Sequence, residues 1–293
     1  MSDANRSACR AGESDRHPYA GQRIALLTQH GKEAILAPVL DAALGCRVTR
    51  VEGFDTDTLG TFTRDIPRAG SQIEAARGKA RIGMEISGLP LGLASEGAFG
   101  ADPFLGALPW NSELLLFVDD LRGIEVTGWA QQATRFAHTL TGDWQATRRF
   151  AAEAGFPEHH LVVRPAHQDD ARIEKGIADW ATLAAAFSRA QAAADNGLVF
   201  LEHDARAHAH PTRREAIRLA AENLRDKLLS LCPVCGMPGY WLVERLPGLP
   251  CADCGAPTRE TYAEVWGCPK CAYREERMIP GDADPGRCDV CNP

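Results

Sequence analysis

The last 62 residues of the chain contain four Cys-x-x-Cys pairs, and these constrain the fold of this end more than any other feature. The pairs are separated by 15, 13 and 16 residues, and they are Cys232 and Cys235, Cys251 and Cys254, Cys268 and Cys271, and Cys288 and Cys291. Two cysteines at this spacing direct their sulfurs to one point, and Zn²⁺ binds four such ligands in a tetrahedron. Residues 232–293 are therefore predicted to form a double zinc ribbon with two structural sites of four cysteines each.

The spacing leaves three ways of joining the four pairs into two sites: sequential, nested or interleaved. Residues 251–271 alone have the length of a compact ribbon, with strands expected at 260–265 and 273–278, and this favours nested pairing. Sequential pairing closes the shorter loops for the outer pairs, and shorter loops cost less entropy to close. We prefer the sequential arrangement.

Two features of the sequence indicate a reducing compartment. The regular Cys-x-x-Cys spacing serves a metal site better than a disulfide framework, which forms in oxidising compartments. Residues 1–20 are polar and lack the apolar stretch of a signal peptide, so we expect a disordered tail there. The longest aliphatic run, 114–118, has five residues and is far too short for a membrane span. We therefore expect a cytoplasmic protein without a membrane partner.

The charge distribution disfavours nucleic acid as a partner. The formal net charge of the chain is −7. From residue 232 onward, six Lys and Arg residues stand against nine Asp and Glu residues, and eight thiolates exceed the charge of two Zn²⁺ ions. Nucleic-acid binding depends on clustered basic side chains that neutralise phosphates. The predicted ribbon is acidic instead, so we do not expect it to bind DNA or RNA.

Apolar runs and helical periodicity alternate along the first two thirds of the chain. The expected strands cover residues 23–28, 47–52, 90–95, 114–118, 124–127, 161–164 and 198–202. The expected helices cover residues 33–44, 71–86, 129–140, 144–154, 173–194 and 211–229. A capping box at Ser71 and Glu74 opens the second helix, and Pro38 is expected to kink or restart the first. The alternation predicts an α/β domain over residues 21–231, with a mixed or mostly parallel sheet flanked by helices.

Ligands of open α/β sheets bind beyond the carboxyl ends of the strands, so the residues that follow each strand are candidates for a site. Thr28, His30 and Lys32 follow the first expected strand, in a polar turn that could hold an anion such as phosphate. Glu96 and Gly97 follow the third, where a carboxylate beside small residues could ligate Mg²⁺. An ordinary surface turn is the alternative interpretation of each segment.

Polar residues also gather after the last expected strand. Side chains alternate along an extended segment, so one face of this one would carry Glu202, Asp204, Arg206, His208 and His210. This density fits a metal site, and the alternative is a structural pairing of Asp204 with Arg206 beside the next helix. The loop 55–65, rich in Asp and Thr, is a further candidate that suits plain turns equally well.

The architecture as a whole resembles a bacterial family of unknown function that joins an α/β domain to a double zinc ribbon. The resemblance covers residues 21–293. It rests on the cysteine pairs and on the segments 28–32 (TQHGK), 54–63 (FDTDTLGTFT), 93–100 (LASEGAFG) and 206–208 (RAH). That family implies no activity.

Residues 23–100 are also similar, more distantly, to the nucleoside-triphosphate pyrophosphatases that act on inosine and xanthosine triphosphates. In that superfamily a first strand ends in Thr-x-Asn-x-x-Lys, a helix carries Ala-x-x-Lys/Arg-Ala, and a later strand ends in an acidic residue followed by Gly. Here Thr28 with Lys32, the segment 76–80 (ARGKA), and Glu96 with its following glycine stand in the same order. The chain departs from the pattern at His30, which replaces the Asn, and at Lys32, which comes one residue early.

This similarity implies Mg²⁺ between Glu96 and the phosphates of a nucleotide, with Lys32 and Lys79 on phosphate oxygens and an activated water attacking phosphorus. With the polar segment after the last strand included, the candidate catalytic residues are Glu96, Lys32, Lys79, Asp204 and Arg206. The candidate residues that bind the cofactor and substrate are Thr28, His30 and Gly97.

We therefore expect a Mg²⁺-dependent enzyme that hydrolyses a nucleotide or a related phosphate ester and that contains two structural zinc ions. The alternative is a non-catalytic protein whose ribbon binds a protein partner. Apolar groups that suit such contact are Tyr240, Trp241, Leu242, Val265 and Trp266. Small folds also need such side chains for their own core, so packing within the ribbon is the other interpretation of these residues.

Overall fold

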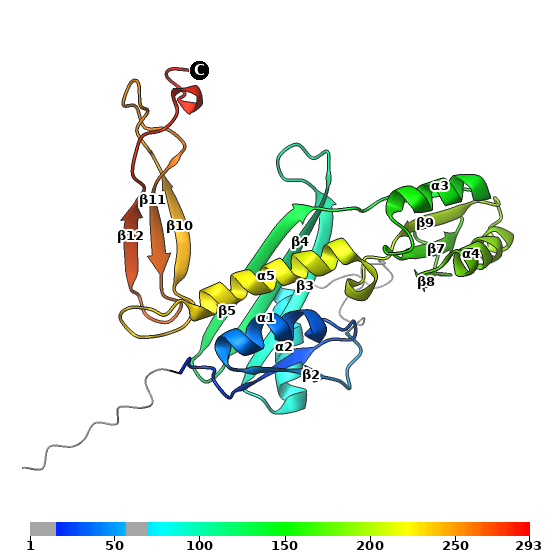
Figure 1. Cartoon of the computed structure of the whole chain (residues 1–293), viewed down its shortest axis with the longest axis horizontal. Helices are drawn as coiled ribbons and strands as arrows, with labels where there is room; N and C mark the ends of the chain where they lie inside the picture. Colours follow the sequence, from blue (N-terminus) through cyan, green and yellow to red (C-terminus); the bar gives the residue numbers. More distant parts are fainter. Residues whose placement is uncertain (1–15, 57–69) are drawn as a thin grey trace, which may run out of the picture.

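The computed structural model describes residues 16–56 and 70–293 of the chain. It confirms a mixed α/β architecture that is followed by a small cysteine-rich module of antiparallel strands (Figure 1). The α/β part contains two sheets, each with its own helices, where the sequence predicted one. Below, these are the first sheet and the second sheet, and residues 232–293 are the ribbon.

The first sheet has five strands in the order β2-β1-β3-β4-β5. They are β1 (Arg23–Leu27), β2 (Arg47–Val51), β3 (Leu91–Ala101), β4 (Pro109–Asp119) and β5 (Ile124–Ala133). β1 runs parallel to both β2 and β3, while β3, β4 and β5 form an antiparallel meander. The mixed sheet expected from the sequence is therefore confirmed.

Helices cover both faces of the first sheet. One face packs against α1 (Glu33–Leu44) and α5 (Pro211–Leu229), and the other packs against α2 (Gln72–Ser87). The predicted capping box opens α2, because the Ser71 side chain accepts from Glu74 N and the Glu74 carboxylate accepts from Ser71 N. α1 continues through Pro38 without a break. No helix in the described residues is long and apolar enough to cross a membrane.

β3 is longer than the sequence predicted, and its extra length places the candidate site. β1 pairs with β3 only at Gly92 and Leu93, so β3 continues past the end of β1. The rest of β3 pairs with β4 along its whole length. Glu96 and Gly97 therefore lie inside a strand and not in a turn after it. β4 supplies backbone partners that the local sequence of β3 does not reveal.

The second sheet has four antiparallel strands in the order β6-β9-β7-β8. They are β6 (His138–Thr141), β7 (Leu161–Pro165), β8 (Glu174–Ile177) and β9 (Val199–His203). Two helices, α3 (Trp144–Ala154) and α4 (Trp180–Ala193), share a separate apolar core with this sheet. In Figure 1 this unit lies to one side of the first sheet, at the end where α5 begins.

Two expected helices are corrected by the structure. The helix expected over 129–140 is wrong, because β5 continues to Ala133 by pairing with β4 and β6 then begins at His138. The helix expected over 173–194 begins only at Trp180, because the residues before it form β8 on the edge of β7. In both segments, pairing with the preceding strand, β4 for β5 and β7 for β8, outweighs the local helical pattern of the sequence.

The ordered α/β part begins before residue 20. Tyr19 belongs to the expected tail, yet its side chain is fully buried and contacts Phe117. Its hydroxyl donates a hydrogen bond to Asp119 Oδ2 (3.0 Å), and the guanidinium of Arg122 lies over its ring. Residues 1–15 of the expected tail lie outside the described residues.

The ribbon contains a three-stranded antiparallel sheet of β10 (Trp241–Pro247), β11 (Thr261–Gly267) and β12 (Arg274–Met278). The strands expected at 260–265 and 273–278 correspond to β11 and β12 and are confirmed. The ribbon follows directly on α5, where the backbone N–H groups of Gly239 and Tyr240 donate to the carbonyl of Ser230. The described residues also include the 3-10 helices η2 (Ala207–Ala209) and η3 (Pro285–Arg287).

The packing of α5 on β5 leaves no room for a side chain at Gly128. A Cβ there would lie 2.4 Å from the carbonyl oxygen of Ala220 and 2.6 Å from Leu224 Cβ. We expect Gly128→Ala to lower the free energy of unfolding by about 2 kcal/mol, because α5 has to move away from the sheet. Gly78→Ala is the matched control, since Gly78 faces open space on α2, and it should raise the free energy of unfolding by about 0.5 kcal/mol. Urea unfolding of the zinc-loaded protein measures both, and equal stabilities would contradict this packing.

Candidate functional site

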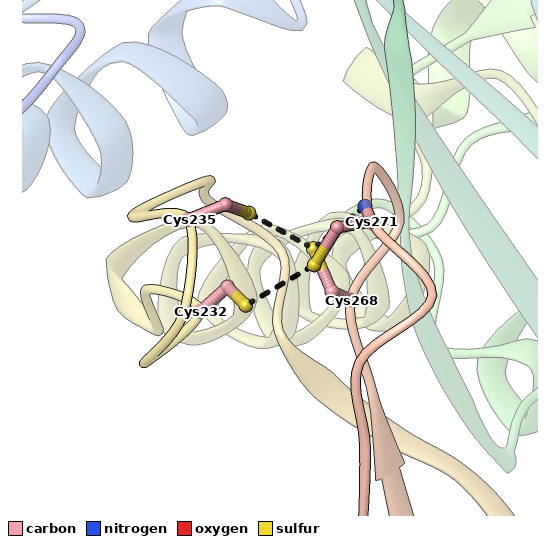
Figure 2. A group of neighbouring side chains, drawn as sticks. All are labelled: Cys232, Cys235, Cys268 and Cys271. Atoms are coloured by element: carbon pink, nitrogen blue, oxygen red, sulfur yellow. Dashed lines mark hydrogen bonds between the residues drawn. The ribbon is translucent and has the colours of Figure 1, made fainter.

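The ribbon brings its eight cysteines into two groups of four. One group is Cys232, Cys235, Cys268 and Cys271 (Figure 2), and the other is Cys251, Cys254, Cys288 and Cys291. Sulfur atoms facing each other across a site are 3.6 to 3.8 Å apart. This is the edge length of a tetrahedron with Zn–S distances of about 2.3 Å, and it is far longer than a disulfide bond of about 2.05 Å. The donor set and its geometry therefore fit two zinc ions.

The pairing of the cysteines is interleaved, so the sequential pairing that we preferred is wrong. The first Cys-x-x-Cys pair shares a site with the third, and the second shares a site with the fourth. The strands explain this result, because β11 runs antiparallel to β10 and β12 runs antiparallel to β11. Each linker between cysteine pairs holds one strand and carries the chain to the other end of the ribbon. Odd-numbered pairs therefore meet at one end and even-numbered pairs at the other.

Both cysteine sites are closed. Four thiolates complete a tetrahedral coordination shell, which leaves no position for a reacting water or a substrate. The backbone N–H groups of Lys270 and Cys271 donate to Cys268 Sγ (3.3 and 3.4 Å), and such hydrogen bonds stabilise the charge of a ligating thiolate. The sites can stabilise the fold of the ribbon, and a catalytic role has to be sought elsewhere in the chain.

The aromatic side chains of the ribbon pack against one another. Tyr240 is buried, and its hydroxyl donates to Glu275 Oε2 (2.7 Å). The rings of Trp241 and Trp266 have centroids 5.2 Å apart, and the guanidinium of Arg277 lies 4.3 Å from the Trp266 centroid. These contacts favour packing within the ribbon, which was one of the two interpretations of its aromatic residues.

A second candidate site lies in the α/β part, where charged side chains from five elements are buried together. They are Lys32 at the start of α1, Lys79 on α2, Glu96 on β3, Glu113 on β4 and Arg213 on α5. Lys79 and Glu96 form one ion pair, and Arg213 Nε and Glu113 Oε1 form another at 2.7 Å. Lys79 is the most exposed of the five, with 15% of its side chain accessible. Below, these residues are the charged cluster.

The charged cluster occupies both faces of the first sheet. Successive side chains of a strand point to opposite faces, so Glu96 points with Ala94 toward α2. Glu113 points with Leu115 toward α5. Lys32 lies between the two groups, at the edge of β3 that β1 leaves uncovered. The turn after β1 therefore places Lys32 within electrostatic range of both ion pairs.

Lys32 is held in place by β3. Its Nζ donates to the carbonyl oxygen of Ser95 (2.7 Å) and to Ser95 Oγ (3.2 Å). Burial, together with the charge of Arg213, lowers the pKa of Lys32 to about 7, although Glu113 and Glu96 act in the opposite direction. Contact with an anion favours the charged form of such a lysine. The electrostatic environment of Lys32 is therefore suited to an anionic ligand.

Gly97 provides the space for the ion pair between Glu113 and Arg213. It lies opposite Glu113 in the register of β3 and β4. A Cβ at Gly97 would lie 2.3 Å from Glu113 Oε1 and 2.7 Å from Arg213 Nη2. Arg213 Nη1 also donates to the carbonyl oxygen of Ala205 (2.6 Å), so the arginine joins β4 to the segment that follows β9. Only glycine fits at this position of the strand.

Thr28 and His30 lie in the turn after β1. Thr28 is buried, and its Oγ1 accepts a hydrogen bond from His30 N (3.4 Å). The ring of His30 lies 5.5 Å from the ring of His208, which belongs to the segment after β9. Of the candidate loop, Asp55 is described and accepts from Gln29 Nε2 (3.2 Å), whereas its residues from 57 onward lie outside the described residues.

Asp204 and Arg206 pair with each other. Arg206 Nη2 lies 2.5 Å from Asp204 Oδ2, and the backbone N–H of Gly176 donates to the same oxygen (2.9 Å). Burial alone would raise the pKa of Asp204, but the hydrogen bonds and charge of Arg206 outweigh it, and the pKa is lowered. This is the structural pairing that the sequence left open as an alternative to a metal site.

The segment after β9 does not stay extended, so the single polar face expected from Glu202 to His210 is wrong. The chain turns into η2 directly after Arg206. His210 then lies at the start of α5, where its side chain accepts a hydrogen bond from Arg213 N (3.2 Å). This contact caps the helix and explains the position of His210 without a ligand.

The structure thus brings together three of the five candidate catalytic residues, Lys32, Lys79 and Glu96. It adds Glu113 and Arg213, which the sequence analysis missed. Both are charged residues at the edge of an apolar or helical pattern, Glu113 just before the run 114–118 and Arg213 in the first turn of α5. A carboxylate at the start of an apolar strand is a weak signal, and nothing in the sequence connects it to an arginine 100 residues away.

A family with the description "Domain of unknown function (DUF6671)" matches residues 79–293. The chain belongs to this family. The matched range of the DUF6671 family includes all eight ribbon cysteines and four residues of the charged cluster, and Lys32 precedes it. No curated protein and no solved structure matches the chain. The expected membership of a family of unknown function is therefore confirmed.

Interleaved pairing predicts how double variants of this DUF6671 chain lose zinc. Replacing Cys235 and Cys268 with Ser removes two of the four ligands from one site and none from the other, so about one of the two zinc ions should remain. Replacing Cys235 and Cys254 removes a ligand from each site, so both ions should be lost or weakened. Elemental analysis of the purified variants measures the zinc content. Sequential or nested pairing would make the first variant lose both ions.

The lowered pKa of Lys32 predicts a pH dependence for anion binding. Protonated Lys32 attracts an anion, so affinity should be highest below pH 7 and should fall by up to about tenfold per pH unit above it. Calorimetric titration with inorganic tripolyphosphate from about pH 6 to about pH 9, without added divalent cation, measures this dependence. Lys32→Arg is the control, because arginine stays charged over this range and should flatten the profile. Identical profiles for the two proteins would assign the titration to another group.

Proposed function

We propose that this chain is a Mg²⁺-dependent phosphohydrolase that acts on a nucleotide or a related phosphate ester. The observation that carries the proposal is the charged cluster, in which three cations and two carboxylates from five elements are buried at one place. Buried charges are costly unless they are paired, so a cation in excess of the carboxylates is best explained by an anionic ligand. A phosphate group supplies the missing negative charge.

The cluster has the groups that phosphoryl transfer needs. Lys32, Lys79 and Arg213 can bind phosphate oxygens and stabilise the charge that develops on them. In hydrolysis, the oxygen of water forms a bond to phosphorus, the bridging P–O bond breaks, and the leaving oxygen keeps the electron pair. Mg²⁺, when bound, neutralises the phosphate oxygens and activates the water. The attacking water loses a proton, and a nearby carboxylate such as Glu96 can accept it.

The similarity of residues 23–100 to the inosine and xanthosine triphosphate pyrophosphatases supports the same proposal. The residues that this similarity names, Lys32, Lys79 and Glu96, come from three separate elements and converge in the charged cluster. The similarity places Mg²⁺ at Glu96 and suggests a nucleoside triphosphate as the first substrate class to test. The two zinc sites take no part in this chemistry, because they are closed.

The proposal predicts activity that depends on Glu96. The zinc-loaded protein with Mg²⁺ should release pyrophosphate or phosphate from at least one nucleoside triphosphate in a panel of common and deaminated bases. Glu96→Gln should lower kcat by at least about 100-fold, because it removes the charge of the carboxylate next to the reacting water. Glu125→Gln is the matched control, since Glu125 also joins the sheet to α2 by an ion pair, with Arg77 at 2.8 Å, but is partly exposed.

The control variant should keep full activity, and circular dichroism verifies that both variants are folded. A lack of turnover across the panel, or an activity that Glu96→Gln leaves unchanged, would contradict the proposed function.

A further inference from the structure

Two buried oxygen atoms on β4 have no hydrogen-bond partner among the described residues. One is Oε2 of Glu113, which belongs to the charged cluster, and the other is Oδ1 of the neighbouring Asn111. Both side chains are fully buried. They lie two residues apart on β4, on the face of the first sheet that packs against α5. Asn111 Nδ2 donates to Glu113 Oε1 (3.1 Å), so the two groups are in direct contact.

The neighbouring contacts determine which atoms remain available. Asn111 Nδ2 also donates to the carbonyl oxygen of Ala98 (3.2 Å), and this fixes the orientation of the amide, so that Oδ1 is the atom without a donor. Glu113 Oε1 accepts from Arg213 Nε (2.7 Å) as well as from Asn111, which leaves Oε2. A buried oxygen without a hydrogen-bond donor has lost its contacts with water and has not replaced them. Because buried polar groups in folded proteins nearly always have a partner, a water or an ion is expected at such an atom.

The chemistry of these two atoms is that of a hard cation site. Mg²⁺ binds carboxylate and amide oxygens, and it typically takes only one or two protein ligands and completes its shell with waters and substrate phosphates. Glu113 Oε2 and Asn111 Oδ1 provide one carboxylate and one amide oxygen. The other carboxylate of the cluster, Glu96, already has the ammonium group of Lys79 as an ion-pair partner.

We propose that Glu113 and Asn111 hold the divalent cation, through Glu113 Oε2 and Asn111 Oδ1. This inference rests on the proposed function and deepens it. It moves the cation from Glu96, where the resemblance to the pyrophosphatases would place it, to the opposite face of the first sheet, beside α5.

The charges of the cluster predict that the cation binds together with a polyphosphate. The charges within each of the two ion pairs, Lys79 with Glu96 and Arg213 with Glu113, balance each other. Protonated Lys32 therefore gives the cluster a net positive charge. A lone cation is repelled by this excess. The oxygens of a bound polyphosphate reverse the sign and supply further ligands.

Equilibrium dialysis of the zinc-loaded full chain against Mn²⁺, with and without inorganic tripolyphosphate, tests the inference. We expect the wild-type protein to retain about one Mn²⁺ per chain when tripolyphosphate is present, and at least about tenfold less without it. Glu113→Gln should abolish this retention. Glu96→Gln should keep it, and it is a matched control because Glu96 is likewise a buried carboxylate on the first sheet that pairs with a cation.

Two variants of Asn111 keep the test independent of the ion pair with Arg213. Asn111→Leu keeps the branched heavy-atom skeleton but removes Oδ1, and it should lower Mn²⁺ retention at least about tenfold. Asn111→Asp replaces the amide oxygen with a carboxylate oxygen and should retain Mn²⁺. In addition, Mn²⁺ with tripolyphosphate should raise the thermal unfolding temperature of Asn111→Asp more than that of the wild type, because the added cation neutralises the second carboxylate. Equal retention by the two variants would overturn the role of Asn111.

The outcomes separate this inference from the proposed function. Retention by Glu113→Gln together with loss in Glu96→Gln would overturn the inference and leave the proposed function with its cation at Glu96. If the wild-type protein binds tripolyphosphate but retains no Mn²⁺ when both are present, the cation site alone is overturned. Absence of both Mn²⁺ and tripolyphosphate from the wild-type protein would overturn both.

Discussion

The packing of α5 on the first sheet is the contact on which the arrangement of the other parts depends. Ile217 and Leu224 are fully buried against the sheet, and the burial of each such side chain contributes about 2 kcal/mol. The first turn of α5 holds Arg213 against Glu113, and its last turn leads into the ribbon. A buried ion pair contributes little net stability, because both groups lose their water. The apolar face of α5 therefore keeps Arg213 buried, and one helix positions the charged cluster at one end and the zinc module at the other.

The two groups of four cysteines are positioned to support the ribbon when they bind zinc. Most side chains of β10 and β12 are partly or fully exposed, so the three strands bury little apolar surface of their own. Metal binding supplies the folding free energy of such modules. One site joins Cys235 to Cys268 across β10 and β11, and the other joins Cys254 to Cys288 across β11 and β12. Both sites enclose β11, so zinc at either site would hold the end of the central strand next to it.

The sequence predicted those features that are encoded locally. The capping box at Ser71 and the zinc chemistry of the cysteines each depend on spacings of two or three residues. The cysteine pairing was mistaken, although it follows from the strands: two strands had been expected, and a linker that holds one strand has to end at the opposite side of the ribbon. The length of β3 and the partnership of Glu113 with Arg213 were out of reach, because both depend on contacts with distant parts of the chain. Periodicity carries no information about such partners.

The charged cluster is costly for the fold, and this cost is the best argument for its function. Apolar residues at the same positions would pack well without desolvating any charge. Burial and the charge of Arg213 both disfavour the protonated form of Lys32, which has a pKa of about 7. A bound anion would favour this charged form. Gly97 shows that even the backbone is fitted to the ion pair, since no larger residue leaves room for it. Buried charges, a lysine with a lowered pKa and a glycine inside a strand all disfavour folding, and they occur together where several elements meet. In folded proteins such places are typically binding or catalytic sites.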